Sequence, residues 1–87
     1  MHELSLLDDL LGKIEALVQE HQAQRVLALT LRIGCLAHIS PEHLRHHFLL
    51  AAPGTVVEGA RLEIKVLNDL THPQAQEIVL EAVELDA

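Results

Sequence analysis

The sequence predicts an α+β fold in which two helices pack on one face of a small three-stranded sheet, in the order α-β-α-β-β. The chain has 87 residues, enough for one hydrophobic core under two layers of secondary structure. Apolar residues recur at helical spacing in two segments and alternate with other residues in three more. Residues 1–87 therefore form a single domain in this prediction.

The first predicted element is a helix over residues 4–20. Asp8 and Asp9 lie in its first half, where the positive end of the helix dipole favours acidic side chains. Its apolar residues are mostly three or four positions apart, so they share one face, which is expected to enter the core. They are Leu4, Leu7, Leu10, Leu11, Ile14, Leu17 and Val18.

Residues 25–33 change to a period of two, which predicts a strand with one buried face. Gly34 ends this strand. The side chains expected in the core are Leu27, Leu29, Leu31 and Ile33.

A second helix is predicted from Pro41 to about Ala52. Ser40 suits the N-cap because its hydroxyl can accept a hydrogen bond from a backbone N–H, and Pro41 suits the first helical position. Pro53 and Gly54 stop the helix. Its apolar face comprises Leu44, Phe48 and Ala51 or Ala52, with Leu49 beside it.

Two further strands are predicted over residues 61–66 and 77–85, separated by a polar loop. The last strand contains a phase slip. Two apolar residues before Ala82 share one face, and two after it share the other face if alternation is strict. A β-bulge near Ala82 would bring all four to the core. The four are Ile78, Leu80, Val83 and Leu85.

The charge balance excludes several classes of function. Thirteen acidic residues against six basic ones give a net charge of −7 with His neutral, which argues against binding to nucleic acid or to an anionic membrane. Phe48 is the only Phe, Trp or Tyr, so an aromatic platform for single-stranded nucleic acid is excluded as well. No apolar run approaches the roughly 18 residues that span a bilayer, and no secretory signal is recognisable. We expect a cytoplasmic protein.

No arrangement of residues typical of catalysis is recognisable. The sequence lacks a Ser-His-Asp spacing, a glycine-rich phosphate loop and paired carboxylates, so we expect no enzymatic activity. Its one cysteine, Cys35, cannot form an internal disulfide or a thiolate zinc site, and the simplest expectation for it is a buried, inert thiol. Seven histidines in 87 residues are the one compositional anomaly.

The first candidate metal site is Met1-His2-Glu3. The α-amine of Met1, the amide nitrogen of His2 and the His2 imidazole can close two fused chelate rings on one ion. This near-planar nitrogen set suits Ni(II) or Cu(II) better than Zn(II). A fourth donor has to come from Glu3 or from elsewhere. The donors must be deprotonated, so binding should weaken as pH falls. Spacing alone does not distinguish this site from a solvated histidine beside an initiator methionine.

The second candidate is the group of histidines around the start of the second helix. His43 and His47 are four residues apart and so lie on one helical face, where they could chelate a transition metal. His46 is expected to point away from that pair, which argues against one site that also includes His38. The alternative is an exposed polar face that contacts water or a partner. The sequence leaves the role of these four histidines open.

Taken together, the segments resemble the HypA/HybF family of nickel metallochaperones, which act in nickel–iron hydrogenase maturation. The N-terminal sequence Met1-His2-Glu3-Leu4-Ser5-Leu6 is the specific part of the resemblance. The remaining similar segments are Leu31-Arg32-Ile33-Gly34, Pro41-Glu42 with Leu44-Arg45, Gly54-Thr55, Glu58 to Ile64, and the last strand from Glu77 to Leu85. The resemblance therefore covers nearly the whole chain in one order.

The resemblance implies a Ni(II) site formed by Met1, His2 and Glu3, on the same order of helices and strands as the periodicity predicts. It also implies two partners, a hydrogenase-maturation GTPase and the hydrogenase large-subunit precursor that receives the nickel. A three-stranded sheet leaves two exposed edges, which allows a homodimer.

One departure from the family is large. The family inserts a zinc domain with two Cys-x-x-Cys pairs where this chain has a short loop without cysteine, about residues 67–76. No structural zinc is therefore expected. His72 lies in this loop and is a candidate fourth nickel donor, although a lone loop histidine is more often simply solvated. The missing domain favours an alternative function, a HypA-like adaptor for a maturation complex that has lost zinc and nickel handling.

Overall fold

A computed structural model describes residues 3–86, with side chains from Leu7 onward. Its elements follow the predicted order and confirm the α+β class. They are α1 (Glu3–Glu20), β1 (Arg25–Gly34), α2 (Pro41–Ala51), β2 (Arg61–Leu67) and β3 (Ile78–Asp86).

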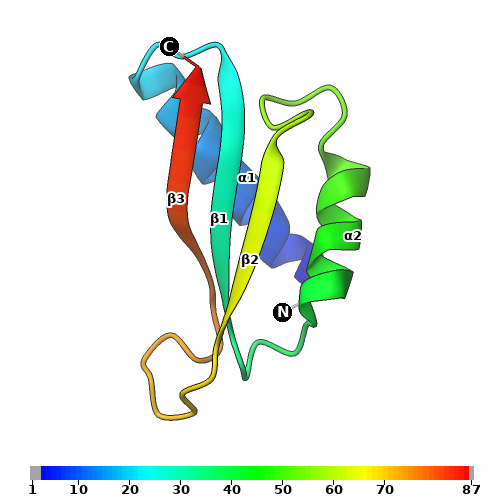
Figure 1. Cartoon of the computed structure of the whole chain (residues 1–87), viewed down its shortest axis with the longest axis vertical. Coiled ribbons are helices and arrows are strands. Elements are labelled where there is room, and N and C mark those ends of the chain that lie inside the picture. The colour runs from blue at the N-terminus through cyan, green and yellow to red at the C-terminus, as the bar shows by residue number, and fades with distance from the viewer. Residues whose placement is uncertain (1–2, 87) are drawn as a thin grey trace.

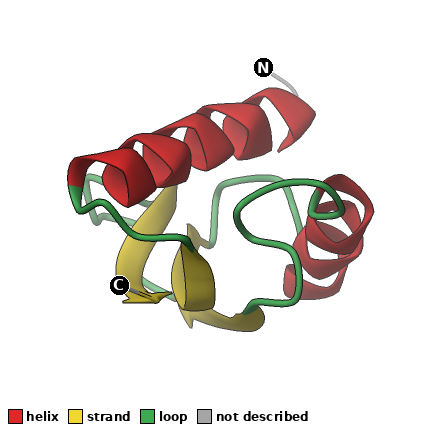
Figure 2. Ribbon diagram, turned by 90° about the horizontal axis from the view of Figure 1, so that it is seen from above, coloured by secondary structure: helices red, strands yellow, loops and turns green. Residues whose placement is uncertain are grey.

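The three strands form one sheet in the order β2-β1-β3, so the first strand is the central one. β1 pairs with β2 in parallel and with β3 antiparallel. A parallel pair needs a crossover connection, and the segment that contains α2 supplies it. Figures 1 and 2 show both helices on the same side of the sheet, with α1 running diagonally across the strands and α2 beside β2. This is the predicted two-layer arrangement.

The core lies between the sheet and the two helices. Leu31 of β1 and Leu44 of α2 are completely buried, and Phe48 is 1% exposed. Full burial of an apolar side chain of this size contributes about 1.5–3 kcal/mol. The buried apolar residues of the core are Leu7, Leu10, Ile14, Val18, Val26, Leu29, Leu31, Ile33, Ala37, Leu44, Phe48, Ala52, Val57 and Leu62.

One residue of β1 was assigned to the wrong face by alternation. Leu27, expected in the core, is 38% exposed, whereas its neighbour Val26 is 1% exposed. The pairing with β3 passes from Val26 opposite Leu85 to Ala28 opposite Glu84, which leaves Leu27 as an extra residue. Such a β-bulge reverses the side-chain alternation on one side of it. The prediction failed because strict alternation does not allow for an inserted residue.

The predicted bulge in β3 is confirmed one residue from the expected position. Thr30 pairs with Ala82 and Leu31 with Leu80, so Glu81 is the extra residue. All four apolar residues around this bulge pack against the core as partly buried side chains; they are Ile78, Leu80, Val83 and Leu85.

Helix α2 begins and packs as the sequence predicts. The backbone N–H of His43 donates to the Ser40 hydroxyl at 3.1 Å, and Pro41 is the first helical residue. Leu44 and Phe48 are the buried residues of the helix. Leu49, predicted beside the apolar face, is 61% exposed. The capped start and the buried face fix the direction in which the remaining side chains of α2 project.

The end of the sheet at which β1 finishes, called here the Gly34 end, holds the connection 35–40 and the loop 68–77 against each other. The amides of Gly34 and Leu36 donate to the carbonyls of Glu77 and Ala75, at 2.9 and 2.7 Å. A Cβ on Gly34 would collide with the Ala75 carbonyl, so only glycine permits this close approach. The short loop therefore folds tightly against the sheet.

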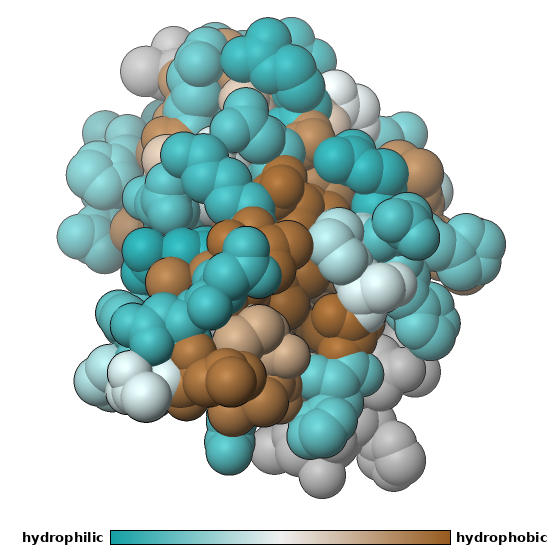
Figure 3. Space-filling view, turned by 60° about the horizontal axis from the view of Figure 1, so that its bottom comes forward, coloured by the Kyte–Doolittle hydropathy of each residue, from teal (hydrophilic) through white to brown (hydrophobic). Residues whose placement is uncertain are grey.

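Figure 3 brings the Gly34 end forward and shows a band of apolar surface across it, bordered by hydrophilic side chains. On β2 and the loop 68–77, the exposed large apolar residues are Val66 and Leu70, at 44% and 66% exposure. Within residues 3–86, no helix is long and apolar enough to cross a membrane.

Candidate metal-binding residues

The N-terminal candidate site, Met1-His2-Glu3, includes the first residue of α1 and the two residues before it in the sequence. Met1 and His2 lie outside the described residues, and Glu3 is described only as the first residue of the helix. The first N–H groups of a helix have no carbonyl partner within it. At the Glu3 position, a metal bound to backbone nitrogen therefore competes with no helical hydrogen bond.

The head of α1 lies on the α2 side of the molecule, and the other end of α1 lies beside β3. Figures 1 and 2 agree on this placement. Helix α1 also contacts both α2 and β3. The fold thus brings the head of α1 to the side of the molecule on which α2 lies.

His72, the predicted fourth donor, lies in the loop 68–77 and is partly buried. Its Nδ1 accepts a hydrogen bond from the backbone N–H of Gln74 at 3.0 Å. A neutral imidazole that accepts at Nδ1 carries its proton on Nε2. A metal would have to displace the Gln74 amide or remove that proton. The role of His72 remains a prediction, and it requires the loop to rearrange.

The loop that holds His72 is tied to the open face of the sheet. Gln74 accepts a hydrogen bond from the Arg32 guanidinium at 3.0 Å, and Arg32 lies 3.8 Å from the Glu81 carboxylate. Lys65 pairs with the same carboxylate at 3.0 Å, and this bond raises the pKa of Lys65. Within the loop, a hydrogen bond from the Thr71 hydroxyl lowers the pKa of Asp69. Of these contacts, the hydrogen bond between Arg32 and Gln74 ties the loop to β1.

The histidines of α2 lie closer together than expected. The ring centroids of His43 and His47 are 4.6 Å apart, with an angle of 39° between the ring planes. His46, expected to point away, has its centroid 6.0 Å from that of His47. The Nε2 atom of His47 is buried and has no hydrogen-bond partner in the described part of the chain. His38 lies apart in the connection 35–40, exposed and with a positive φ of 61°.

No group of three or more His, Cys, Asp or Glu side chains that could hold a metal is found among the described side chains. Cys35, expected to be buried, is exposed. The buried-thiol prediction was wrong because Cys35 follows the last residue of β1, where its side chain is no longer covered by the helices. Exposure by itself does not make Cys35 a metal ligand.

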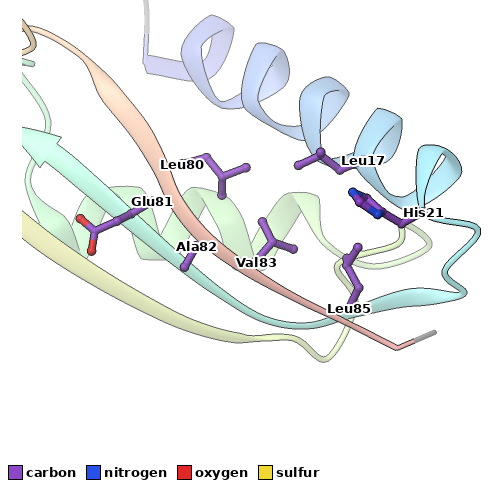
Figure 4. Close-up of a pocket in the computed structure, with 7 residues that line it drawn as sticks. All are labelled: Leu17, His21, Leu80, Glu81, Ala82, Val83 and Leu85. Atoms are coloured by element: carbon purple, nitrogen blue, oxygen red, sulfur yellow. The ribbon is translucent and has the colours of Figure 1, made fainter.

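Sequence reasoning missed a groove between the end of α1 and β3. Leu17 and His21 form its α1 side, and residues 80–83 with Leu85 form its β3 side. Figure 4 shows His21 near Leu17, and Glu81 directed away from it. This separation leaves the groove without a facing acid–base pair. The sequence contains no signal for this groove, because a single sequence does not reveal that β3 lies at the edge of the sheet.

Comparison with known proteins identifies the family. Residues 1–83 match the model of the family described as HypA, hydrogenase/urease nickel incorporation, metallochaperone. The chain belongs to this family. The match includes the N-terminal Met1-His2-Glu3 and ends within β3.

Several curated relatives are hydrogenase maturation factors named HypA. The chain is 42% identical to the protein from Desulfitobacterium hafniense (strain DSM 10664 / DCB-2) over 67 residues, which are 77% of this chain and 59% of the relative. It is 39% identical to the protein from Archaeoglobus fulgidus over 66 residues, 76% of this chain and 60% of the relative. The chain thus spans about three fifths of the length of these relatives.

The fold matches that of a solved structure at low sequence identity. The solution structure of the nickel metallochaperone HypA from Helicobacter pylori superimposes with a TM-score of 0.83 and 19% identity, covering 100% of this chain and 99% of that one. At that level of identity, the likeness concerns the fold alone.

Proposed function

We propose that this chain carries Ni(II) as cargo, bound at its N-terminus by the Met1 amine, the His2 amide nitrogen and imidazole, and Glu3. The observation that carries the proposal is that Met1-His2-Glu3 lies within the segment matched by the nickel-incorporation family. A near-planar set of nitrogen donors suits Ni(II). Nickel that is held this way stays at one end of the chain, from which it can be passed on.

The head of α1 is a suitable support for such a chelate. Helix α1 begins at Glu3, directly after the two residues that supply the nitrogen donors. The positive end of the helix dipole stabilises the negative charge of a deprotonated amide nitrogen. The buried face of α1, which includes Leu7, Leu10 and Ile14, fixes the helix to the sheet. The chelate would therefore be attached to a helix whose position is fixed by the core.

Membership of a nickel-incorporation family supports a proposal about delivery and partners. We propose that the chain passes Ni(II) to a hydrogenase large-subunit precursor with the help of a GTPase. His2 and Glu3 at the start of α1, together with the exposed Glu42 and His43 of α2, would form the contact surface. The chain's net charge of −7 favours a basic patch on the partner. Structural zinc has no place in this proposal because Cys35 is the only cysteine.

Calorimetric titration of Ni(II) into tag-free protein tests the proposal. We expect one tightly bound ion per chain, and we expect its affinity to fall by about 100-fold or more in His2→Ala and in a protein with two residues added before Met1, because each change removes donors of the chelate. His21→Ala is the matched control: this histidine is exposed just beyond the other end of α1. Ni(II) binding that keeps its full affinity after both N-terminal changes would contradict the proposal.

A second candidate function is an adaptor that docks in a maturation complex without handling nickel. It is favoured by the loop between β2 and β3, which contains no cysteine where the family resemblance implies a zinc domain. The two functions differ in two results. The adaptor requires partner binding to be unaffected by His2→Ala and no tight Ni(II) binding by the unaltered protein.

A further inference from the structure

We propose that His43 and His47 form a second binding site on α2 for a first-row transition ion, with two imidazole ligands and water in the remaining positions. The site is separate from the N-terminal chelate and does not depend on it. Its ligands come from one helix, four residues apart, so they lie on the same helical face.

The ring positions fit a chelate with an angle near 90° at the ion. A metal–nitrogen bond is about 2.0–2.1 Å, and a ring centre lies about 1.1 Å beyond its nitrogen, so two imidazoles at a right angle have centroids about 4.5 Å apart. A tetrahedral angle would require about 5.2 Å by the same geometry. The observed separation of 4.6 Å favours the square or octahedral angles of Cu(II) and Ni(II).

The lone pairs of these two rings are uncommitted. Neither His43 nor His47 uses a ring nitrogen in a hydrogen bond or ion pair with the described side chains or backbone, and Nε2 of His47 is buried without a partner. A buried polar atom left unsatisfied costs free energy that a bound ligand can recover. His72 differs, because its Nδ1 already accepts the Gln74 amide. The α2 pair therefore has no protein donor to displace.

The helix holds the pair ready for binding. Ser40 caps the helix, and Leu44 and Phe48 anchor its buried face, so the backbone positions of His43 and His47 are set before an ion arrives. His47 is partly buried, which restrains its ring, whereas His43 is exposed and can turn its ring to aim a nitrogen. Such preorganisation reduces the entropy lost on binding.

The surrounding charges suit a cation without supplying a third protein ligand. Glu42 lies in the first turn of α2, and the chain as a whole is acidic. The ring centroid of His46 lies 6.0 Å from that of His47, farther apart than two adjacent ligands of one ion at a right or tetrahedral angle. His46 is therefore the matched control: the same residue type, on the same helix, outside the chelate.

The test uses the full chain with two residues added before Met1, which removes the N-terminal chelate and so makes the result independent of the proposed nickel-carrier function. Cu(II) chloride and Ni(II) chloride are titrated separately by calorimetry, and the Cu(II) complex is examined by electron paramagnetic resonance. We expect one bound ion, tighter for Cu(II) than for Ni(II), with splitting from two imidazole nitrogens.

Two substitutions decide the assignment. In His43→Ala we expect the affinity to fall about tenfold or more and the spectrum to show one nitrogen, because a single imidazole loses the gain in effective concentration that chelation provides. His46→Ala should leave both unchanged. Three results would each overturn the proposal. They are an extended chain that binds no ion, a His43→Ala variant that keeps the full affinity, and a His46→Ala variant that loses as much affinity as His43→Ala. His43 is exposed, so the decisive variant should keep the fold.

Discussion

On the face of the sheet that the helices cover, Leu29, Leu31 and Ile33 of β1 are at most 2% exposed. Their neighbours Thr30 and Arg32 on the opposite face stay partly exposed, and that face carries charged pairs such as Lys65–Glu81. β1 thus contributes side chains to the buried core on one face of the sheet and to a solvent-exposed surface on the other. Stability is concentrated on the covered face, which leaves the open face more tolerant of change.

Leu31→Ala should have the largest effect, because it removes a completely buried side chain from the middle of the core. We expect a loss of about 2–5 kcal/mol in the free energy of unfolding, measured by chemical denaturation. Thr30→Ala, one position away on the open face, is the control and should cost well under about 1 kcal/mol. Equal losses at the two positions would contradict the difference between the faces.

Gly34→Ala comes next, because the new Cβ would collide with the Ala75 carbonyl. Overpacking of this kind costs about 1–3 kcal/mol. The Leu36 amide, which donates to that carbonyl, should lose protection against hydrogen exchange. Gly12→Ala is the control: a Cβ there meets nothing within 4 Å, so this helix should gain about 0.5–1 kcal/mol. If Gly34→Ala leaves the free energy of unfolding unchanged, the loop 68–77 does not need its close approach to Gly34.

Ser40→Ala should have a smaller effect, since it removes only the hydroxyl that caps α2. The lost hydrogen bond to the His43 amide should lower the free energy of unfolding by about 1 kcal/mol. Ser40→Asp, which keeps a capping oxygen, should restore most of it. If Ser40→Asp is as unstable as Ser40→Ala, the cap is not the cause.

Glu81→Gln should have the smallest effect, because it removes exposed ion pairs with Lys65 and Arg32 on the open face. The pKa of Lys65, raised by Glu81, should fall in this variant, which NMR titration can measure. A raised pKa stabilises the fold below the pKa of the unfolded state, and the gain is lost as pH rises through the folded pKa. The Lys65 contribution should therefore be constant near neutral pH and disappear only in alkali. If Glu81→Gln lowers the free energy of unfolding as much as Leu31→Ala does, the open face contributes to stability as strongly as the core.

Sequence periodicity predicted all five elements, because burial on one face imposes a period of two on strands and about 3.6 on helices. The β3 bulge was predictable because the apolar residues themselves change phase there. The β1 bulge was not, because Leu27 is as apolar as the Val26 that replaces it in the core. Alternation cannot choose between two adjacent apolar residues.

The candidate sites were predictable in residue type and less so in environment. The sequence places His43 and His47 on one helical face, and the structure adds their 4.6 Å separation. The hydrogen bond that occupies Nδ1 of His72 depends on the fold of the loop, which a single sequence does not specify. Cys35 was placed in the core because free cysteines usually are buried, a tendency that takes no account of the end of β1.

The most direct test of the N-terminal chelate is the d–d absorption spectrum of the protein with half an equivalent of Ni(II), recorded for the unaltered chain and for His2→Ala. With protein in excess, the ion occupies the tighter of the available sites. The proposed nitrogen chelate predicts the band of square-planar Ni(II), absent in His2→Ala. A six-coordinate spectrum in the unaltered protein, or a square-planar spectrum that persists without His2, would contradict it.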